Sequence, residues 1–138
     1  MNIQKSAEEL FGGACYAFSI AWINSGVDVR NSFIYLIYDV IQGLNNGYID
    51  PDGFVNAPHM YANMCIGDKI YKDVEKVKIK SLDDLPSEGE WAVEFNHGCK
   101  RHFVVCTKGK VVFDPWEGSE TVKYGKPTSY RKFIKYNK

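Results

Sequence analysis

The sequence Gly12-Gly13-Ala14-Cys15-Tyr16-Ala17-Phe18-Ser19-Ile20-Ala21-Trp22-Ile23 places a cysteine directly after a glycine-containing turn and at the start of an apolar segment. Nearly every position from Ala14 to Ile23 is apolar or small, which predicts a helix that is buried on most of its sides. The unpaired N–H groups and the positive dipole end of a helix favour a thiolate over a thiol. The stretch therefore predicts a nucleophilic Cys15, and the alternative is a small buried side chain without a chemical role.

The first half of the chain is predicted to contain three helices. The Cys15 helix should end at Asn24-Ser25-Gly26, with the glycine as a left-handed C-cap. Apolar residues at helical spacing predict a second helix over residues 33–44, which Asn45-Asn46-Gly47 ends. Pro58 begins a short third helix, and Gly67 closes it.

The second half changes to the two-residue period that is typical of strands. Strands are predicted at residues 70–71, 77–79, 91–95, 102–107, 110–114 and 130–136. Helices followed by an antiparallel sheet indicate an α+β fold. We expect a single domain over residues 1–138, with the cysteine helix packed on the C-terminal sheet.

Composition limits the partners and the compartment. The 138 residues suffice for one domain with a core, and 45% hydrophobic and 25% charged residues are ordinary globular values. Seventeen basic and seventeen acidic residues cancel, which argues against nucleic acid or an anionic membrane as a partner. The N-terminus does not resemble a signal peptide, and no apolar run is long enough to span a membrane. We expect a cytoplasmic monomer with reduced cysteines and no cofactor, although release by phage lysis would need no signal either.

The predicted hairpin around Lys108-Gly109 has two registers. A two-residue loop pairs Phe103 with Asp114 and leaves His102 and Asp114 on opposite faces. A three-residue loop with glycine last is also a common hairpin turn, and it pairs His102 directly with Asp114. We predict the three-residue loop, with Val111 and Phe113 on an apolar face together with Phe103 and Val105.

This register gives Cys15 the partners that acyl transfer requires. Cys15 would be the nucleophile, His102 the general acid and base, and Asp114 the group that orients His102. A histidine next to the thiol would also lower the pKa of the thiol by forming an ion pair.

The order and spacing of these motifs resemble the papain-like cysteine peptidase superfamily. They are Cys15 at the start of a buried helix, then His102-Phe103-Val104-Val105, then Val112-Phe113-Asp114-Pro115. The likeness is greatest to the branch that contains the bacteriocin-leader peptidases. Residues 47–55 and 119–126 are further similar to small papain-like proteins of phages and plasmids.

The resemblance implies a papain-like fold and hydrolysis of a peptide or amide bond through a thioester. The superfamily commonly has a glutamine shortly before the cysteine, whose amide helps to bind the oxyanion. Here Glu9 stands at that position, and Gln4 lies further upstream. Trp116 belongs to a loop expected to contribute to specificity. A leader peptide, a cell-wall peptide, an isopeptide or a host protein would each be a compatible substrate.

Two other interpretations stay open. His97, Cys99, His102 and Cys106 lie within ten residues and could hold zinc, although their spacing matches no common zinc finger. Alternatively, the domain could bind a partner without turnover, in a groove lined by aromatic side chains. Candidates for that lining are Tyr16, Trp116, Tyr124, Tyr130 and Tyr136.

Overall fold

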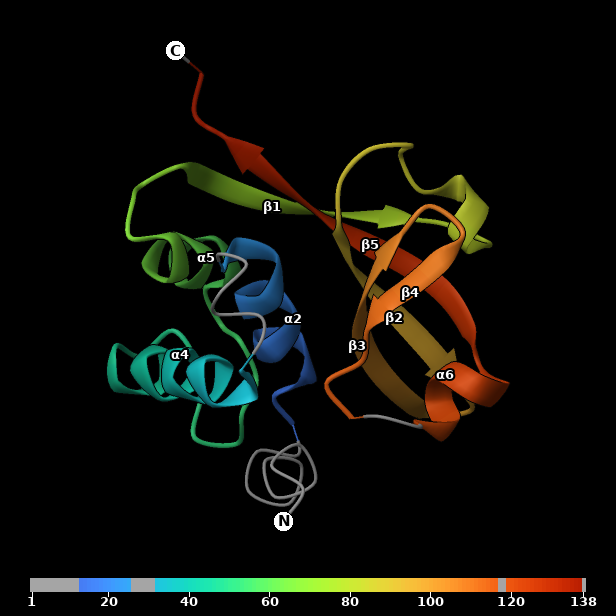
Figure 1. Ribbon diagram of the computed structural model, residues 1–138, viewed down its shortest axis with the longest axis horizontal. Helices are drawn as coiled ribbons and strands as arrows, with labels where there is room; N and C mark the ends of the chain where they lie inside the picture. Colours follow the sequence, from blue (N-terminus) through green and yellow to red (C-terminus); the bar gives the residue numbers. More distant parts are fainter. Residues whose placement is uncertain (1–12, 26–31, 117–118, 138) are drawn as a thin grey trace.

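Three helices lie beside a five-stranded antiparallel sheet in the computed structural model, which describes residues 13–25, 32–116 and 119–137 (Figure 1). The helices are α2 (Cys15–Asn24), α4 (Phe33–Asn45) and α5 (Pro58–Ile66). All three were predicted from sequence, and their bounds differ from the prediction by one or two residues. The chain leaves α2 at Ser25 in an extended conformation, whereas the expected glycine cap at Gly26 lies outside the described residues.

The sheet has the strand order β1-β5-β2-β3-β4, and each neighbouring pair is antiparallel. Its strands are β1 (Tyr71–Lys78), β2 (Trp91–His97), β3 (Lys100–Thr107), β4 (Lys110–Phe113) and β5 (Lys126–Lys135). The two short segments expected at residues 70–71 and 77–79 are one continuous strand, β1. The predicted α+β class is therefore confirmed.

Two short helical turns connect the strands. The 3₁₀ turn η1 (Leu82–Asp84) lies between β1 and β2, and Ser81 and Asp84 cap it reciprocally. Helix α6 (Glu120–Tyr124) was not predicted. Its five residues are too few for an amphipathic period to be recognised in the sequence.

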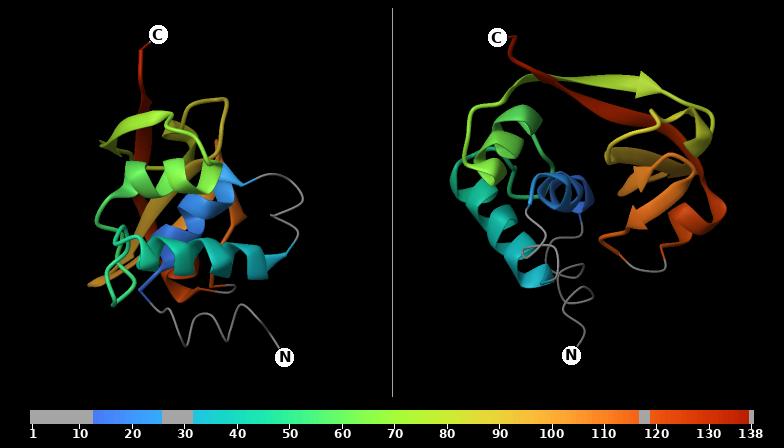
Figure 2. Two further views of the ribbon diagram at one scale, coloured as in Figure 1. Left: turned by 90° about the vertical axis from the view of Figure 1, so that its left-hand side faces the viewer. Right: turned by 45° about the horizontal axis from the view of Figure 1, so that its top comes forward.

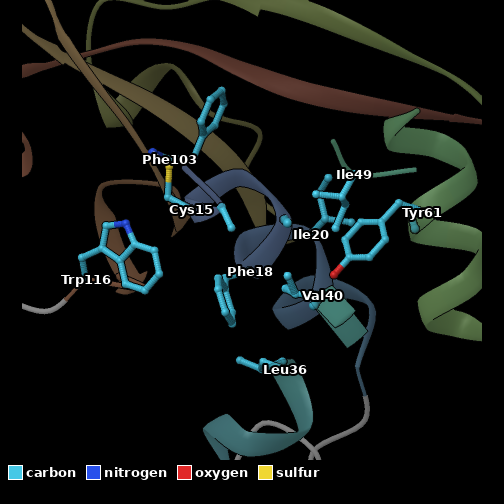
Figure 3. Close-up of a cluster of buried hydrophobic side chains, with 13 residues drawn as sticks. Cys15, Phe18, Ile20, Leu36, Val40, Ile49, Tyr61, Phe103 and Trp116 are labelled. Carbon is cyan, nitrogen blue, oxygen red and sulfur yellow. Dashed lines mark hydrogen bonds between the residues drawn. The ribbon is translucent and has the colours of Figure 1, made fainter. Parts of the chain in front are cut away.

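Helix α2 lies between the sheet on one side and α4 and α5 on the other (Figures 1 and 2). This position explains why its residues are apolar on nearly every side. Phe18 of α2 is fully buried and contacts Phe33 at the start of α4 and Trp116 after β4, with ring centroids 4.9 and 5.4 Å away. The same core continues through Leu36 and Val40 of α4 to Tyr61 of α5 (Figure 3).

The opposite face of the sheet has a second, smaller core. Because successive strand residues point to opposite faces, Phe103 joins the core around α2 whereas Val104 packs in the second core. The buried members of the second core are Leu85, Val93, Phe95, Val104, Cys106 and Tyr130. The middle of the sheet is thus covered on both faces.

The hairpin between β3 and β4 does not have the predicted three-residue loop. Thr107 pairs with Lys110, so Lys108-Gly109 is a two-residue loop, with Gly109 at a φ of 77°. A β-bulge follows, because Cys106 pairs with Val111 but Val105 pairs with Phe113. The extra residue reverses the alternation of β4, and the two residues predicted to share a face do not: Val111 packs in the second core and Phe113 against the core around α2.

Two further expectations concern the oxidation state of the cysteines and the presence of membrane-spanning segments. Cys15, Cys65, Cys99 and Cys106 are free thiols. Within the described ranges, no helix is both long enough and apolar enough to cross a membrane.

Candidate active site

Cys15 is the first residue of α2 and is 9% exposed. The N-cap residue is Ala14, which has no polar side chain to bond the first N–H groups of the helix. Those N–H groups are therefore available to a negative charge at the N-terminus of α2. The Ser19 hydroxyl donates to the Cys15 carbonyl at 2.9 Å within the same helix.

Gly13 allows a loop to approach the turn before the cysteine. A Cβ atom on Gly13 would lie 2.5 Å from the carbonyl oxygen of Asp52, which is shorter than any normal contact. Phe54 of the same loop would lie 3.7 Å from that Cβ atom. The glycine that the sequence places before Cys15 is therefore required for packing against residues 52–54.

His102 and Asp114 form a short hydrogen bond, with 2.6 Å between the histidine Nε2 and the carboxylate Oδ1. The His102 side chain is 5% exposed and the Asp114 side chain 15% exposed, so solvent weakens the interaction little. The backbone N–H of Trp116 donates to the same carboxylate oxygen at 2.9 Å. Asp114 is thus fixed from two directions, by the histidine and by the turn that follows it.

His102 also interacts with Cys15. Burial would lower the pKa of His102, but hydrogen bonds with Asp114 and Cys15 and the charges of both groups outweigh it and raise the pKa to about 9. Because Nε2 bonds Asp114, Nδ1 is the ring nitrogen left for an interaction with Cys15. The structure therefore brings the three predicted residues together in the predicted order, sulfur to imidazole to carboxylate.

The bulge explains how Asp114 reaches His102 despite the two-residue loop. Without it, Asp114 would lie opposite Phe103 and would point away from His102. The extra residue shifts Asp114 to the face of β3 that bears His102, at a diagonal position that a carboxylate and an imidazole can span.

A backbone group adds a contact that sequence reasoning did not find. The N–H of Phe103 donates to the Cys15 sulfur at 3.5 Å, as the dashed line in Figure 3 shows. This N–H is accessible because β4 pairs only with residues 105–107 and leaves the start of β3 uncovered on that side.

The sulfur of Cys15 opens onto a pocket of about 360 Å³. Tyr16 and Phe103, which stack with ring centroids 4.4 Å apart, line the pocket together with Phe54 and Val55. The lining also includes Gly13, Arg101 and Arg131. A pocket of this size beside a cysteine, a histidine and a carboxylate has the composition of a site for acyl transfer.

Comparison with known proteins gives a family. A family model described as "Protein of unknown function, DUF261" matches residues 1–135. The chain belongs to the DUF261 family. No curated protein matches it, and no solved structure does.

The other candidate residues of this DUF261 chain are placed differently. Gln4 and Glu9 lie outside the described residues. Trp116 is 7% exposed, packs on Phe18 and holds Asp114 through its backbone, so its ring belongs to the core. In the part of the chain that the structure describes, no three His, Cys, Asp or Glu side chains are grouped so that they could hold a metal ion.

The aromatic residues that were candidates for a groove separate into three groups. Tyr16 lines the pocket, Tyr130 is buried in the second core, and Tyr124 and Tyr136 are exposed. The arginines of the pocket were not found from sequence. Arg101 could have been found from the sequence, because it is next to His102 and lies on the same strand face as Phe103. Arg131 could not, because it comes from the distant strand β5.

Proposed function

We propose that this DUF261 protein is a papain-like thiol hydrolase, a cysteine peptidase or amidase that acts through Cys15, His102 and Asp114. The observation that supports it most is the 2.6 Å contact between His102 Nε2 and Asp114, together with the raised pKa of His102, to which Asp114 and Cys15 both contribute. Because the pKa of His102 is raised to about 9, the positively charged form of its ring is favoured beside Cys15. Nucleophile, base and orienting group have the roles that acyl transfer requires.

In the first half of the reaction, the Cys15 thiolate attacks the carbonyl carbon of the substrate and forms a tetrahedral oxyanion. The backbone N–H of Cys15, in the uncapped first turn of α2, is a donor for that oxyanion. His102 then gives its proton to the leaving nitrogen. The C–N bond breaks, the amine departs, and a thioester links the acyl group to Cys15.

In the second half, His102 is neutral and acts as a base. It takes a proton from a water molecule, whose oxygen attacks the thioester. The C–S bond breaks, the acid product leaves, and the proton on His102 restores the starting thiolate–imidazolium pair. Asp114 keeps the imidazole ring oriented through both steps, and the Trp116 N–H keeps Asp114 in place.

Acylation can be tested without knowing the natural substrate. We expect N-acetylglycine p-nitrophenyl ester to give a burst of p-nitrophenol equal to the protein concentration, followed by slower turnover. Intact-mass spectrometry should find the acetylglycyl adduct on Cys15. Cys15→Ser should abolish the burst, and His102→Ala should slow it by about 100-fold or more, which is the usual contribution of a positioned acid–base group.

Labelling separates a hydrolase from a binding module. With iodoacetylglycinamide at pH 7, Cys15 should react faster than Cys99, although Cys15 is buried and Cys99 is exposed. Cys106 is an internal control, because burial and the nearby Asp114 raise the pKa of its thiol to about 12. Equal, slow labelling together with no burst would contradict the proposal and would favour a domain that only binds a partner.

A further inference from the structure

The pocket beside Cys15 is positively charged. Of its lining residues, Arg101 and Arg131 are cations, and no carboxylate is among the lining residues that the structure describes. Arg101 is exposed at its rim, and no ion pair joins it to another described residue. Uncharged and apolar groups complete the walls, so a ligand in the pocket meets two guanidinium groups and several aromatic rings.

Arg131, which also lines the pocket, is held in a fixed orientation. Its guanidinium donates to Glu94 at 2.9 Å and to Ser129 at 2.7 Å, and it lies 5.0 Å from the centroid of the Phe103 ring. Although burial opposes ionisation of Glu94, hydrogen bonds from Arg131 and Asn96 hold the pKa of Glu94 below its usual range. The charge of Arg131 is therefore balanced, whereas the charge of Arg101 is not balanced by any residue that the structure describes.

We infer that the pocket binds a carboxylate of the substrate, so that the preferred peptide has an acidic group close to the bond that Cys15 attacks. Arg101 would pair with this carboxylate, and Tyr16 and Phe54 would contact the adjoining apolar part of the chain. The inference rests on the proposed function and names its substrate class. Both an Asp or Glu side chain and a C-terminal carboxylate have this chemistry.

Three alkylating probes of equal reactivity test the inference at Cys15. Iodoacetylglycinamide is neutral, iodoacetylglycine has a C-terminal carboxylate, and the α-amide of iodoacetylglutamic acid has a side-chain carboxylate. In each case a sulfur–carbon bond forms as the carbon–iodine bond breaks and iodide leaves. We expect at least one acidic probe to label Cys15 about 10- to 100-fold faster than the neutral probe, the effect of one charge-assisted hydrogen bond. The faster acidic probe identifies the source of the carboxylate.

Arg101→Gln separates the effect of the pocket arginine on acidic probes from the attraction of His102 for any anion, because the variant keeps His102. It should lower the ratio of the acidic to the neutral labelling rate of Cys15 to about one, and both rates are measured on the same variant. Lys100→Gln is the matched control, because Lys100 is exposed on the same strand and does not line the pocket. It should leave the ratio within about twofold, since solvent and salt screen a charge outside the pocket.

The outcomes distinguish this inference from the function on which it rests. Rapid labelling of Cys15 with the same ratio in wild type, Arg101→Gln and Lys100→Gln overturns the carboxylate site and leaves the hydrolase proposal intact. If no probe labels Cys15 ahead of Cys99, the proposed function fails, and the inference fails with it.

Discussion

Asp114→Asn tests the link between the carboxylate and the charge on His102. The substitution keeps the size of the side chain and an oxygen that can accept a hydrogen bond, but it removes the negative charge 2.6 Å from Nε2. Burial of His102 is unchanged and continues to lower the pKa of its ring. We therefore expect the pKa of His102 in this variant to lie well below its wild-type value.

The size of the expected effect on stability follows from the pKa of His102 in the wild-type protein. The pKa of His102 is raised from 6.5 to about 9. Since one pKa unit is about 1.4 kcal/mol, the site favours the imidazolium by about 3 kcal/mol. The folded state therefore binds the proton more tightly than the unfolded state, and this stabilisation is lost at high pH. It is fully present below pH 6.5 and disappears as the pH rises through about 9.

Two measurements report this effect. Long-range proton–nitrogen NMR spectra of the histidine rings give the pKa of His102 directly, and His102→Gln assigns its signals among the three histidines. Urea unfolding between pH 6 and pH 10 gives the free energy of unfolding. For wild type we expect it to fall by up to about 3 kcal/mol over this range, and for Asp114→Asn the fall should be much smaller.

Glu75→Gln is the control for a general effect of charge, because Glu75 is an exposed carboxylate on β1. It should leave both the pKa of His102 and the pH dependence of stability as in wild type. The reasoning would be refuted by a wild-type His102 that titrates near 6.5, or by an Asp114→Asn variant whose His102 still titrates near 9.

Three other changes test the packing around the site. Gly13→Ala places a Cβ atom 2.5 Å from the Asp52 carbonyl oxygen, and urea unfolding should show a loss of about 1–3 kcal/mol, as for other overpacked sites. Phe18→Ala empties the centre of the core and should cost about 3–5 kcal/mol in the same assay; a loss below 1 kcal/mol would contradict its central position. Deletion of Val112 removes the extra residue of the bulge and should lower the pKa of His102 as Asp114→Asn does, whereas an unchanged pKa would show that the bulge does not position the carboxylate.

The helices could be predicted because their signals are local. Residues 33–44 have a clear apolar stripe with polar residues that end it, and Pro58 and Gly67 mark the ends of α5. Cys15 was recognisable because a glycine-containing turn before an apolar helix is contained within a few residues. These features depend little on the rest of the chain.

The pocket could not be predicted because it is assembled from distant segments. It combines the turn before α2, the loop at residues 54–55, the start of β3 and the middle of β5. Which strand residues meet there depends on the order β1-β5-β2-β3-β4, in which the last strand lies between the first and second. The sequence contains no local sign of that strand order, so it does not predict that Arg131 lies close to Cys15.

The hairpin shows that a correct contact can be predicted from a wrong register. Direct pairing of His102 with Asp114 required a three-residue loop, whereas the chain has a two-residue loop and one extra residue in β4. The predicted register has its extra residue, Thr107, in the loop, whereas the observed register has it as a bulge in β4. Either one-residue shift reverses the face on which Asp114 lies. The packing of apolar residues decides between the three-residue loop and the bulge. With the bulge, Val111 packs beside Cys106 in the second core. Phe113 packs in the core around α2 and stacks on Trp22, with ring centroids 4.2 Å apart. Burial on both faces of the sheet therefore selects the bulge, and the bulge in turn brings Asp114 to His102.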